Sequence, residues 1–138
     1  MPSSDARVLV VDASAFVDLV LNRPLAAVLR KRLIESGASL HAPMIADLEV
    51  LQTIRGYVLI GDLTVARAEE AIEDYLDIRL ERYPHDPLLW EIWQLRSNFT
   101  PYDASYVVLA EQLKATLVTL DLRLARACPP TVRTETYP

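Results

Sequence analysis

Short apolar runs along the chain alternate with longer segments in which apolar residues recur at helical spacing. The run Val8–Val11 is β-branched and too short for a membrane span, which is typical of a buried strand. Strands alternating with helices predict an α/β fold with a central, mainly parallel sheet and helices on both faces. We expect further strands at 39–42, 79–83 and 116–120, an edge strand at 131–136, and helices over 14–21, from Pro24 to Gly37, from 45 to about 56 or beyond, from Thr64, over 86–95, from Thr100 to Lys114 and over 122–127.

Trp90 and Trp93 stand three residues apart, so both lie on one side of the predicted 86–95 helix. We expect this side of the helix to pack into the core of the protein. The alternative is a surface that contacts another protein chain, where tryptophan is a frequent anchor.

The composition describes a single globular domain over residues 1–138, with 51% hydrophobic and 24% charged residues. The one cysteine, Cys128, rules out an internal disulfide framework and indicates a reducing compartment. No segment approaches the ~20 apolar residues of a membrane helix, and residues 1–11 lack the features of a signal peptide. We therefore expect a soluble, cytoplasmic protein that does not associate with membranes.

The net charge of −5 at first argues against nucleic acid as a partner. The excess of acids lies in one segment, residues 69–81, and acids and bases balance in the rest of the chain. Most of the bases are arginine, which binds phosphate in a bidentate manner. Charge alone therefore excludes no class of partner.

Two aspartates each follow an apolar strand. Asp12 comes directly after Val8–Val11, and Asp121 comes directly after the run 116–120. The carboxyl ends of parallel strands meet at one edge of an open α/β sheet, where ligands bind, so we expect both carboxylates at a functional edge. Each aspartate also has a simpler interpretation as the N-cap of the following helix, a role that Ser14 can share with Asp12.

Two further acids are candidates for the same edge. Asp103 is the third residue of a helix that begins with Thr100 and Pro101, and this arrangement also fits a capping box. Glu49 lies at the border of the apolar face of its helix, where a carboxylate is costly unless it is paired or bound to a metal. Its alternative is simple rotation into solvent. Asp47, two residues earlier, is expected to face water.

Four carboxylates at one edge would repel each other, and a divalent cation would remove that penalty. Oxygen ligands without a histidine or cysteine cluster favour Mg²⁺ or Mn²⁺ over zinc. The two histidines, His41 and His85, are far from these acids in the sequence. Since the sequence has no Ser-His-Asp arrangement, no glycine-rich phosphate loop and no CxxC pair, we expect metal chemistry based on acids.

Four stretches of sequence resemble the PIN-domain ribonucleases, and among them the VapC-type toxins of toxin–antitoxin pairs. They are VVDASAFVDLVL, APMIADLEVLQTIRG, NFTPYDASYVVLAEQLKATLVTLD and LRLARA, in the family's order over most of residues 8–127. The resemblance implies a metal-dependent endoribonuclease with a PIN-like three-layer α/β/α sandwich. The sequence departs from the family at Leu120, where a smaller residue is frequent.

The resemblance also assigns residues to the site. The family's acidic metal-site residues, which act in catalysis, correspond to Asp12, Glu49, Asp103 and Asp121. Polar positions around that site, which would orient ligands or phosphate, correspond to Ser14, Asn98 and Thr119.

The mechanism implied by the resemblance uses one or two Mg²⁺ or Mn²⁺ ions to activate water and neutralise the phosphate. The resemblance also implies that RNA is cut to 5′-phosphate and 3′-hydroxyl ends. From their charge alone, arginines such as Arg96 and Arg123 are candidates to hold the RNA backbone. The implied partners are the RNA substrate and a small antitoxin protein that covers the active-site groove. The implied assembly is a homodimer or a toxin–antitoxin hetero-oligomer.

Two other functions fit parts of the sequence. In a non-catalytic α/β module that binds proteins, the aspartates act only as helix caps. The side chain of Glu49 then has no reason to point into the protein. In a phosphoaspartate receiver-like domain, an aspartate after a strand is phosphorylated, which requires a second acid beside it or a lysine after a late strand. No acid stands beside Asp12, and Lys114 precedes its strand, so we rank this function third.

Overall fold

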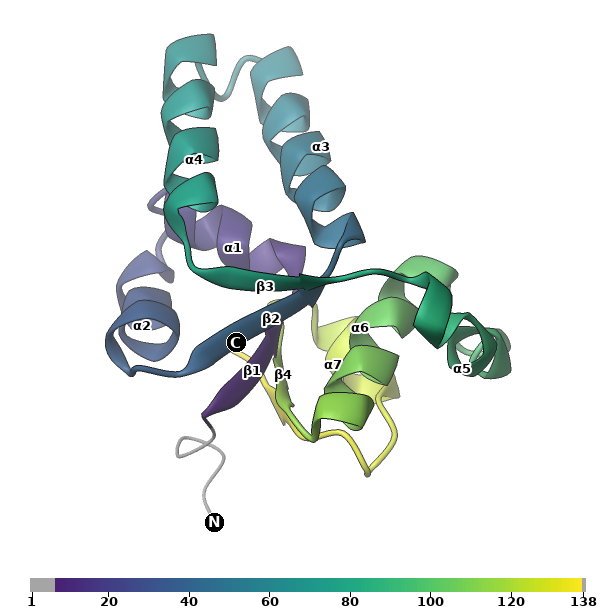
Figure 1. The fold of residues 1–138 in the computed structure, drawn as a ribbon. Helices are drawn as coiled ribbons and strands as arrows, with labels where there is room; N and C mark the ends of the chain where they lie inside the picture. The colour runs from purple at the N-terminus through teal and green to yellow at the C-terminus, as the bar shows by residue number, and fades with distance from the viewer. Residues whose placement is uncertain (1–6, 138) are drawn as a thin grey trace.

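A computed structural model of the protein describes residues 7–137 (Figure 1). Within these residues, five parallel strands form one sheet in the order β3-β2-β1-β4-β5. Because β1 pairs with β2 on one side and with β4 on the other, the direction of the chain across the sheet reverses between β1 and β4. The strands are β1 (Val8–Val11), β2 (Ser39–Pro43), β3 (Leu80–Tyr83), β4 (Thr116–Val118) and β5 (Thr134–Glu135).

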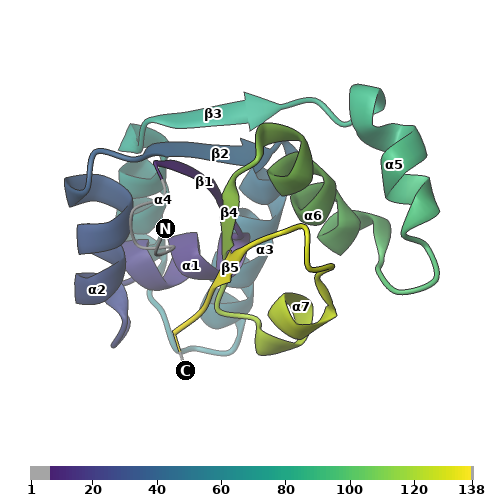
Figure 2. The ribbon, with the colours of Figure 1, turned by 90° about the horizontal axis from the view of Figure 1, so that it is seen from below.

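Helices cover both faces of this sheet (Figure 2). Helices α1 to α4 contact one another on one face, and α6 packs against β1, β2 and β4 on the other with α5 beside it. This arrangement confirms the predicted three-layer α/β/α sandwich. The helices are α1 (Ala13–Val20), α2 (Ala26–Arg30), α3 (Ile45–Leu59), α4 (Val65–Asp77), α5 (Leu89–Gln94), α6 (Pro101–Leu113) and α7 (Leu122–Ala127), with a π-helical turn η2 (Lys31–Glu35) and a 3₁₀ turn η3 (Asp86–Leu88). Across residues 7–137, none of them has both the length and the apolar character needed to cross a lipid bilayer.

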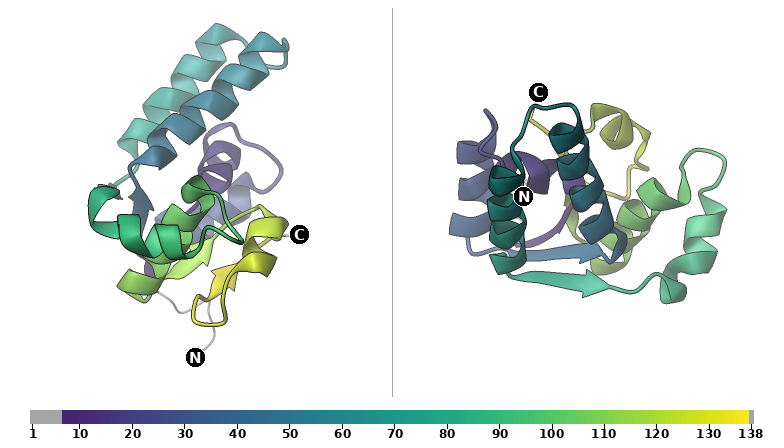
Figure 3. Two further views of the ribbon diagram at one scale, coloured as in Figure 1. Left: turned by 90° about the vertical axis from the view of Figure 1, so that its right-hand side faces the viewer. Right: turned by 90° about the horizontal axis from the view of Figure 1, so that it is seen from above.

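Helices α3 and α4 form an antiparallel pair that projects away from the sheet (Figure 3). Thr64 begins α4 as predicted, since its hydroxyl accepts a hydrogen bond from the amide of Arg67 at 3.1 Å. The projecting pair carries large apolar side chains that are exposed to solvent, among them Leu59, Ile60 and Leu76. It therefore offers an apolar surface that the described part of the chain does not cover.

The expected core packing of Trp90 and Trp93 is wrong. The two residues are 78% and 55% exposed, whereas Leu88 and Ile92 are buried. The short helix α5 packs against α6 through one narrow side, so the tryptophans on its other sides face solvent.

The C-terminal edge strand is shorter than the expected 131–136. Val132 belongs to a turn, because its amide donates to the Pro129 carbonyl at 2.9 Å. Hydrogen bonding with β4 begins at the Arg133 carbonyl, which accepts from the Leu117 amide at 2.8 Å, and the strand itself covers only Thr134–Glu135. The strand is nevertheless at the edge of the sheet, as predicted.

Candidate active site

The strands β1 and β4 end side by side at the carboxyl edge of the sheet. Val11 pairs with Val118, and the amide of Asp12 donates to the Val118 carbonyl at 2.9 Å. Asp12 and Thr119 are therefore the first residues beyond two adjacent strands, at the point where the strand order reverses. This is the position at which open α/β sheets bind ligands.

Asp12 is held by two hydroxyl groups. Ser14 Oγ and Thr119 Oγ1 each donate a 2.8 Å hydrogen bond to Asp12 Oδ2. Asp12 occupies the N-cap position of α1, but its side chain makes no capping hydrogen bond, so the interpretation of this side chain as a helix cap is wrong. Burial raises the pKa of Asp12 above its ordinary value, the hydrogen bonds of the two hydroxyls and of the Ala13 backbone lower it, and the charge of Asp103 raises it. A cation near Asp12 would therefore stabilise the ionised form of this carboxylate.

The same two hydroxyls also fix the chain after β4. Leu120 N donates to Ser14 Oγ at 3.1 Å, and Asp121 N donates to Thr119 Oγ1 at 3.0 Å. The strand is shorter than the predicted 116–120, because β4 ends at Val118. The Thr119 amide still donates to the Glu135 carbonyl at 3.1 Å, and only the amides of Leu120 and Asp121 bond to side chains. This turn brings Asp121 to the edge of the sheet where the first aspartate lies.

Asp121 caps α7, as the simpler interpretation predicted. Its Oδ1 accepts hydrogen bonds from the amides of Arg123 and Leu124 at 3.0 and 3.1 Å. Its other oxygen, Oδ2, lies 3.6 Å from the Arg123 guanidinium. Capping therefore uses one oxygen of the carboxylate and leaves the second for a ligand.

Glu49 points inward from α3 toward α6. The buried phenol of Tyr106 donates a 2.6 Å hydrogen bond to Glu49 Oε1. Burial raises the pKa of Glu49, this hydrogen bond lowers it, and the charges of Asp12 and Asp103 raise it. Sequence reasoning missed Tyr106, although it stands three residues after Asp103, so the two share one face of α6.

Asp103 is electrostatically central to the acidic group. Burial raises its pKa, the nearby Arg123 lowers it and Asp121 raises it. Its own charge raises the pKa of Asp12 and of Glu49. Thr100 caps α6, because its Oγ1 accepts a hydrogen bond from the Asp103 amide at 3.2 Å. Asp103 therefore lies in the first turn of the helix.

One cavity of about 560 Å³ collects these acids. All four carboxylates predicted from the sequence line it, namely Asp12, Glu49, Asp103 and Asp121, together with Ser14. Asn98 is exposed and lines a neighbouring groove instead. The cavity also has walls that sequence reasoning did not predict, Asp18, Tyr57 and Tyr137.

Asp47 does not simply face water, contrary to the prediction. Tyr75 donates a 2.6 Å hydrogen bond to Asp47 Oδ1, and Arg82 Nε lies 2.8 Å from Oδ2. The carboxylate thus joins α3 to α4 and β3, outside the acidic cavity.

The acidic cavity fits a hydrated hard cation. Within residues 7–137, no three acidic, histidine or cysteine side chains are arranged to hold a metal ion between them. Mg²⁺, however, is usually bound through one or two carboxylates and keeps several of its waters. The carboxylates that line the cavity supply an oxygen-only donor set of this kind.

The PIN-domain family model matches residues 9–128 of the chain. The chain belongs to the PIN-domain family. A relative named Ribonuclease VapC1, from Mycobacterium tuberculosis, is 40% identical over 119 residues, which cover 86% of this chain and 89% of the relative. The resemblance to PIN-domain ribonucleases of the VapC type is thereby confirmed.

Two solved structures share this PIN fold. VapC20 of Mycobacterium tuberculosis, a Sarcin-Ricin loop cleaving toxin, matches with a TM-score of 0.64 and 15% identity over 91% of this chain and 98% of that one. VapBC2 of Rickettsia felis, bound to a DNA fragment from its promoter, matches with a TM-score of 0.64 and 16% identity over 95% and 99%. At these identities the likeness establishes the fold.

Proposed function

We propose that this PIN-domain protein is a metal-dependent endoribonuclease and the toxin of a toxin–antitoxin pair, built as one domain over residues 1–138. The observation that carries the proposal is the convergence of four carboxylates on one cavity at the β1/β4 edge. The relative VapC1, a named ribonuclease, supports RNA as the substrate.

Each part of the site has a role in this reaction. A bound Mg²⁺ or Mn²⁺ supplies an activated water and neutralises charge on the phosphate. Ser14 and Thr119 hold Asp12 in the orientation needed to bind the cation, and Tyr106 does the same for Glu49. The residues that would hold the cation, directly or through its waters, are Asp12, Glu49, Asp103 and Asp121. The products carry 5′-phosphate and 3′-hydroxyl ends.

The inward direction of Glu49 favours an enzyme over a non-catalytic binding module. A module that uses its acids only as helix caps does not need a half-buried carboxylate that is hydrogen-bonded to Tyr106. Such a module also has no use for the Asp12 carboxylate, because this side chain makes no capping hydrogen bond to α1. The electrostatic cost of this arrangement is explained by a site that binds a cation.

The proposed partner protein is a small antitoxin. The exposed apolar side chains of the α3–α4 pair, such as Leu59 and Ile60, provide a surface of the kind that mediates protein contacts. The proposed assembly is a homodimer or a toxin–antitoxin hetero-oligomer in the cytoplasm. Light scattering of the chain alone and with the product of a neighbouring small gene measures which assembly forms.

Incubation of the purified chain with total RNA tests the proposed function. Cleavage is expected with Mg²⁺ or Mn²⁺ and is expected to stop with EDTA, and mapped cut ends give the chemistry of the products. Asp12→Asn and Asp103→Asn should each abolish cleavage while the circular dichroism spectrum stays unchanged. Asp77→Asn, an exposed acid on α4, is the matched control and should cut like the wild type. Normal cleavage by the Asp12 and Asp103 variants would contradict the assignment.

A further inference from the structure

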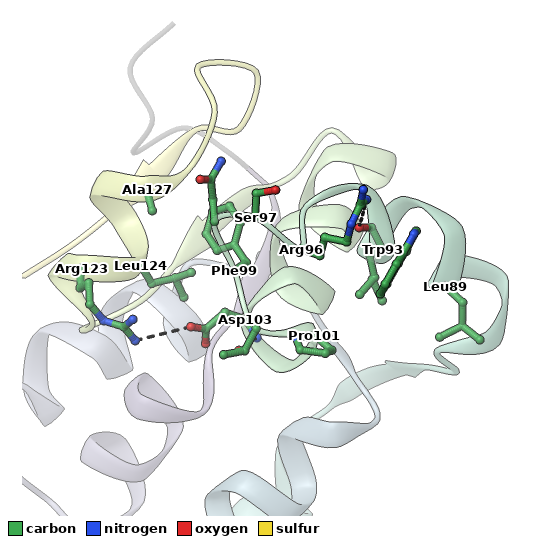
Figure 4. Close-up of a pocket in the computed structure, with 13 residues that line it drawn as sticks. Leu89, Trp93, Arg96, Ser97, Phe99, Pro101, Asp103, Arg123, Leu124 and Ala127 are labelled. Carbon is green, nitrogen blue, oxygen red and sulfur yellow. Dashed lines mark hydrogen bonds and ion pairs between the residues drawn. The ribbon is translucent and has the colours of Figure 1, made fainter.

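An apolar groove of about 710 Å³ lies beside the acidic cavity, between α5, the segment that follows it, and α7 (Figure 4). Its volume falls within the range of about 300–1,000 Å³ that is typical of small-ligand pockets. The proposed reaction does not use it. Most of its wall consists of apolar side chains, namely Leu89, Ile92, Phe99, Pro101, Leu124 and Ala127.

The groove and the acidic cavity share part of their walls. Asp103 lines both of them, and Arg123 in the wall of the groove lies 3.6 Å from Asp121 in the wall of the cavity. In Figure 4 these two residues face each other at one end of the groove, with Trp93 and Arg96 toward the other end. A ligand in the groove therefore lies directly next to the carboxylates proposed to cut RNA.

Arg123 is placed to bind an anion at this junction. Its guanidinium lies 3.5 Å from Asp103 Oδ2 and 3.6 Å from Asp121 Oδ2, and its side chain is 79% exposed. These distances exceed the ~2.7–2.9 Å of a tight charge-assisted hydrogen bond, so the guanidinium is only loosely held. It can turn toward a phosphate that enters the site.

Trp93 and Arg96 form a flat, charged platform at the other end of the groove. The Arg96 guanidinium lies 4.7 Å from the centre of the Trp93 ring, and Arg96 Nη1 donates to the Trp93 carbonyl at 3.1 Å. Within residues 7–137, no carboxylate forms an ion pair with Arg96. The exposed side chains of Ser97 and Asn98 add hydrogen-bonding groups along the same groove.

We propose that this groove binds the base of an unpaired RNA nucleotide adjacent to the phosphate that is cut. The inference rests on the proposed ribonuclease function and extends it to the substrate class. A nucleotide joins a flat base, with stacking faces and hydrogen-bonding edges, to a phosphate. The apolar groove with its polar residues Ser97 and Asn98 can take the base, and Arg123 at the end of the groove near the acids can take the phosphate. Stacking on aromatic rings and guanidinium planes is the general way in which proteins hold unpaired bases. Bases inside a duplex are stacked on each other and cannot enter the groove.

Binding of a short, fluorescent, single-stranded oligoribonucleotide tests the inference. Fluorescence anisotropy is measured with Mg²⁺ in an Asp12→Asn background, so that the RNA is not cut. Adding Trp93→Ala should weaken binding about 5- to 150-fold, since stacking on one base is worth ~1–3 kcal/mol. Trp90→Ala is the matched control, because Trp90 lies on the same helix, is 78% exposed and does not line the groove. It should leave the affinity unchanged.

Two further arms make the result decisive. Arg96→Gln changes an exposed side chain without disturbing the core. Like Trp93→Ala, it should lower the affinity for the single-stranded RNA. A blunt duplex of the same sequence should compete poorly with the single strand. Loss of affinity that is confined to Trp93→Ala and Arg96→Gln supports the inference.

Equal RNA affinity of the Trp90 and Trp93 variants would overturn the inference. In that case, metal-dependent cleavage by the wild type would leave the proposed function standing. If instead binding depends on Trp93 but the wild type never cuts RNA, the ribonuclease proposal fails while the base-binding groove is retained. The two failures are therefore distinguishable.

Discussion

The phenol of Tyr106 donates a 2.6 Å hydrogen bond to the carboxylate of Glu49, which is 57 positions away in the sequence. The bond joins α6, on one face of the sheet, to α3, on the other face. It favours the ionised form of Glu49 and so opposes the effect of burial on the pKa of this carboxyl. Tyr106 is therefore a positioning residue for one of the proposed cation-binding acids.

Tyr106→Phe should lower the cleavage rate by roughly 10–100-fold, the usual effect of losing a partner that orients a metal ligand. Without the hydrogen bond the pKa of Glu49 rises further, so the acidic limb of the rate-against-pH profile should move to higher pH. Tyr102→Phe, an exposed tyrosine on the same helix, is the control. A slower enzyme with an unshifted profile would reduce Tyr106 to a packing role.

Thr119→Val should raise the Mg²⁺ concentration needed for half-maximal activity. The valine keeps the shape of this buried side chain but removes the hydroxyl that donates to Asp12 and accepts the Asp121 amide. A loss of metal affinity of about 10–100-fold is expected. Metal titrations of the cleavage rate measure it, with Ser39→Ala, a hydroxyl at the amino end of β2, as the control. An unchanged Mg²⁺ requirement would argue against a role of Thr119 in holding Asp12.

The raised pKa of Asp12 predicts how the stability of the folded protein changes with pH. Because the folded pKa lies above the ordinary value of 3.8, the native state binds this proton more readily than the unfolded state. The Asp12 contribution to stability should therefore fall as pH rises from about 4 through the raised pKa, and then stay constant. Without metal, Asp12→Asn should melt at a higher temperature than the wild type at pH 7, and the difference should vanish near pH 3.

Adding Mg²⁺ should reverse this order, so that the wild type melts at a higher temperature than Asp12→Asn. A cation beside the ionised carboxylate stabilises the native wild type, whereas the asparagine variant gains less. Thermal melts of both chains at several pH values, with EDTA or with Mg²⁺, measure the effect. A wild type that stays more stable than Asp12→Asn at neutral pH without metal would contradict the prediction.

Arg123→Gln should reduce the salt dependence of RNA binding. If Arg123 neutralises one phosphate, the slope of log affinity against log salt concentration should become less steep by about 0.7, the value for one contact to a single strand. Arg126→Gln, on the same helix and exposed, is the control, since Arg126 does not line the groove or the acidic cavity. Identical slopes for the two variants would remove Arg123 from the phosphate contacts.

Many elements of this fold follow from interactions between residues close in sequence. The β-branched run Val8–Val11 forms a central strand as predicted, and Thr64 and Thr100 begin their helices as predicted, because each cap bonds to an amide three residues later. The convergence of Asp12 and Asp121 on one edge was also predictable. The carboxyl ends of two parallel, neighbouring strands lie at the same edge of a sheet, and β1 and β4 are such a pair.

Long-range partners were not predictable in this way. Asp47 carries no local sign that it pairs with Arg82, 35 residues away, and the spacing of Trp90 and Trp93 does not reveal which side of α5 is covered. Both depend on which element lies alongside in space, and helical periodicity shows only which side chains share a face.

The sequence by itself determined the order of strands and helices, the main helix starts and the four acids that line the cavity and are proposed to bind the cation. The tertiary structure alone decided that Tyr106 orients Glu49, that one oxygen of Asp121 is committed to a helix cap, and that Arg123 lies between two acids at the mouth of an apolar groove. The reason is physical. Backbone conformation responds mainly to neighbours within a few residues, whereas burial, charge pairing and cavity walls arise when distant segments pack against each other.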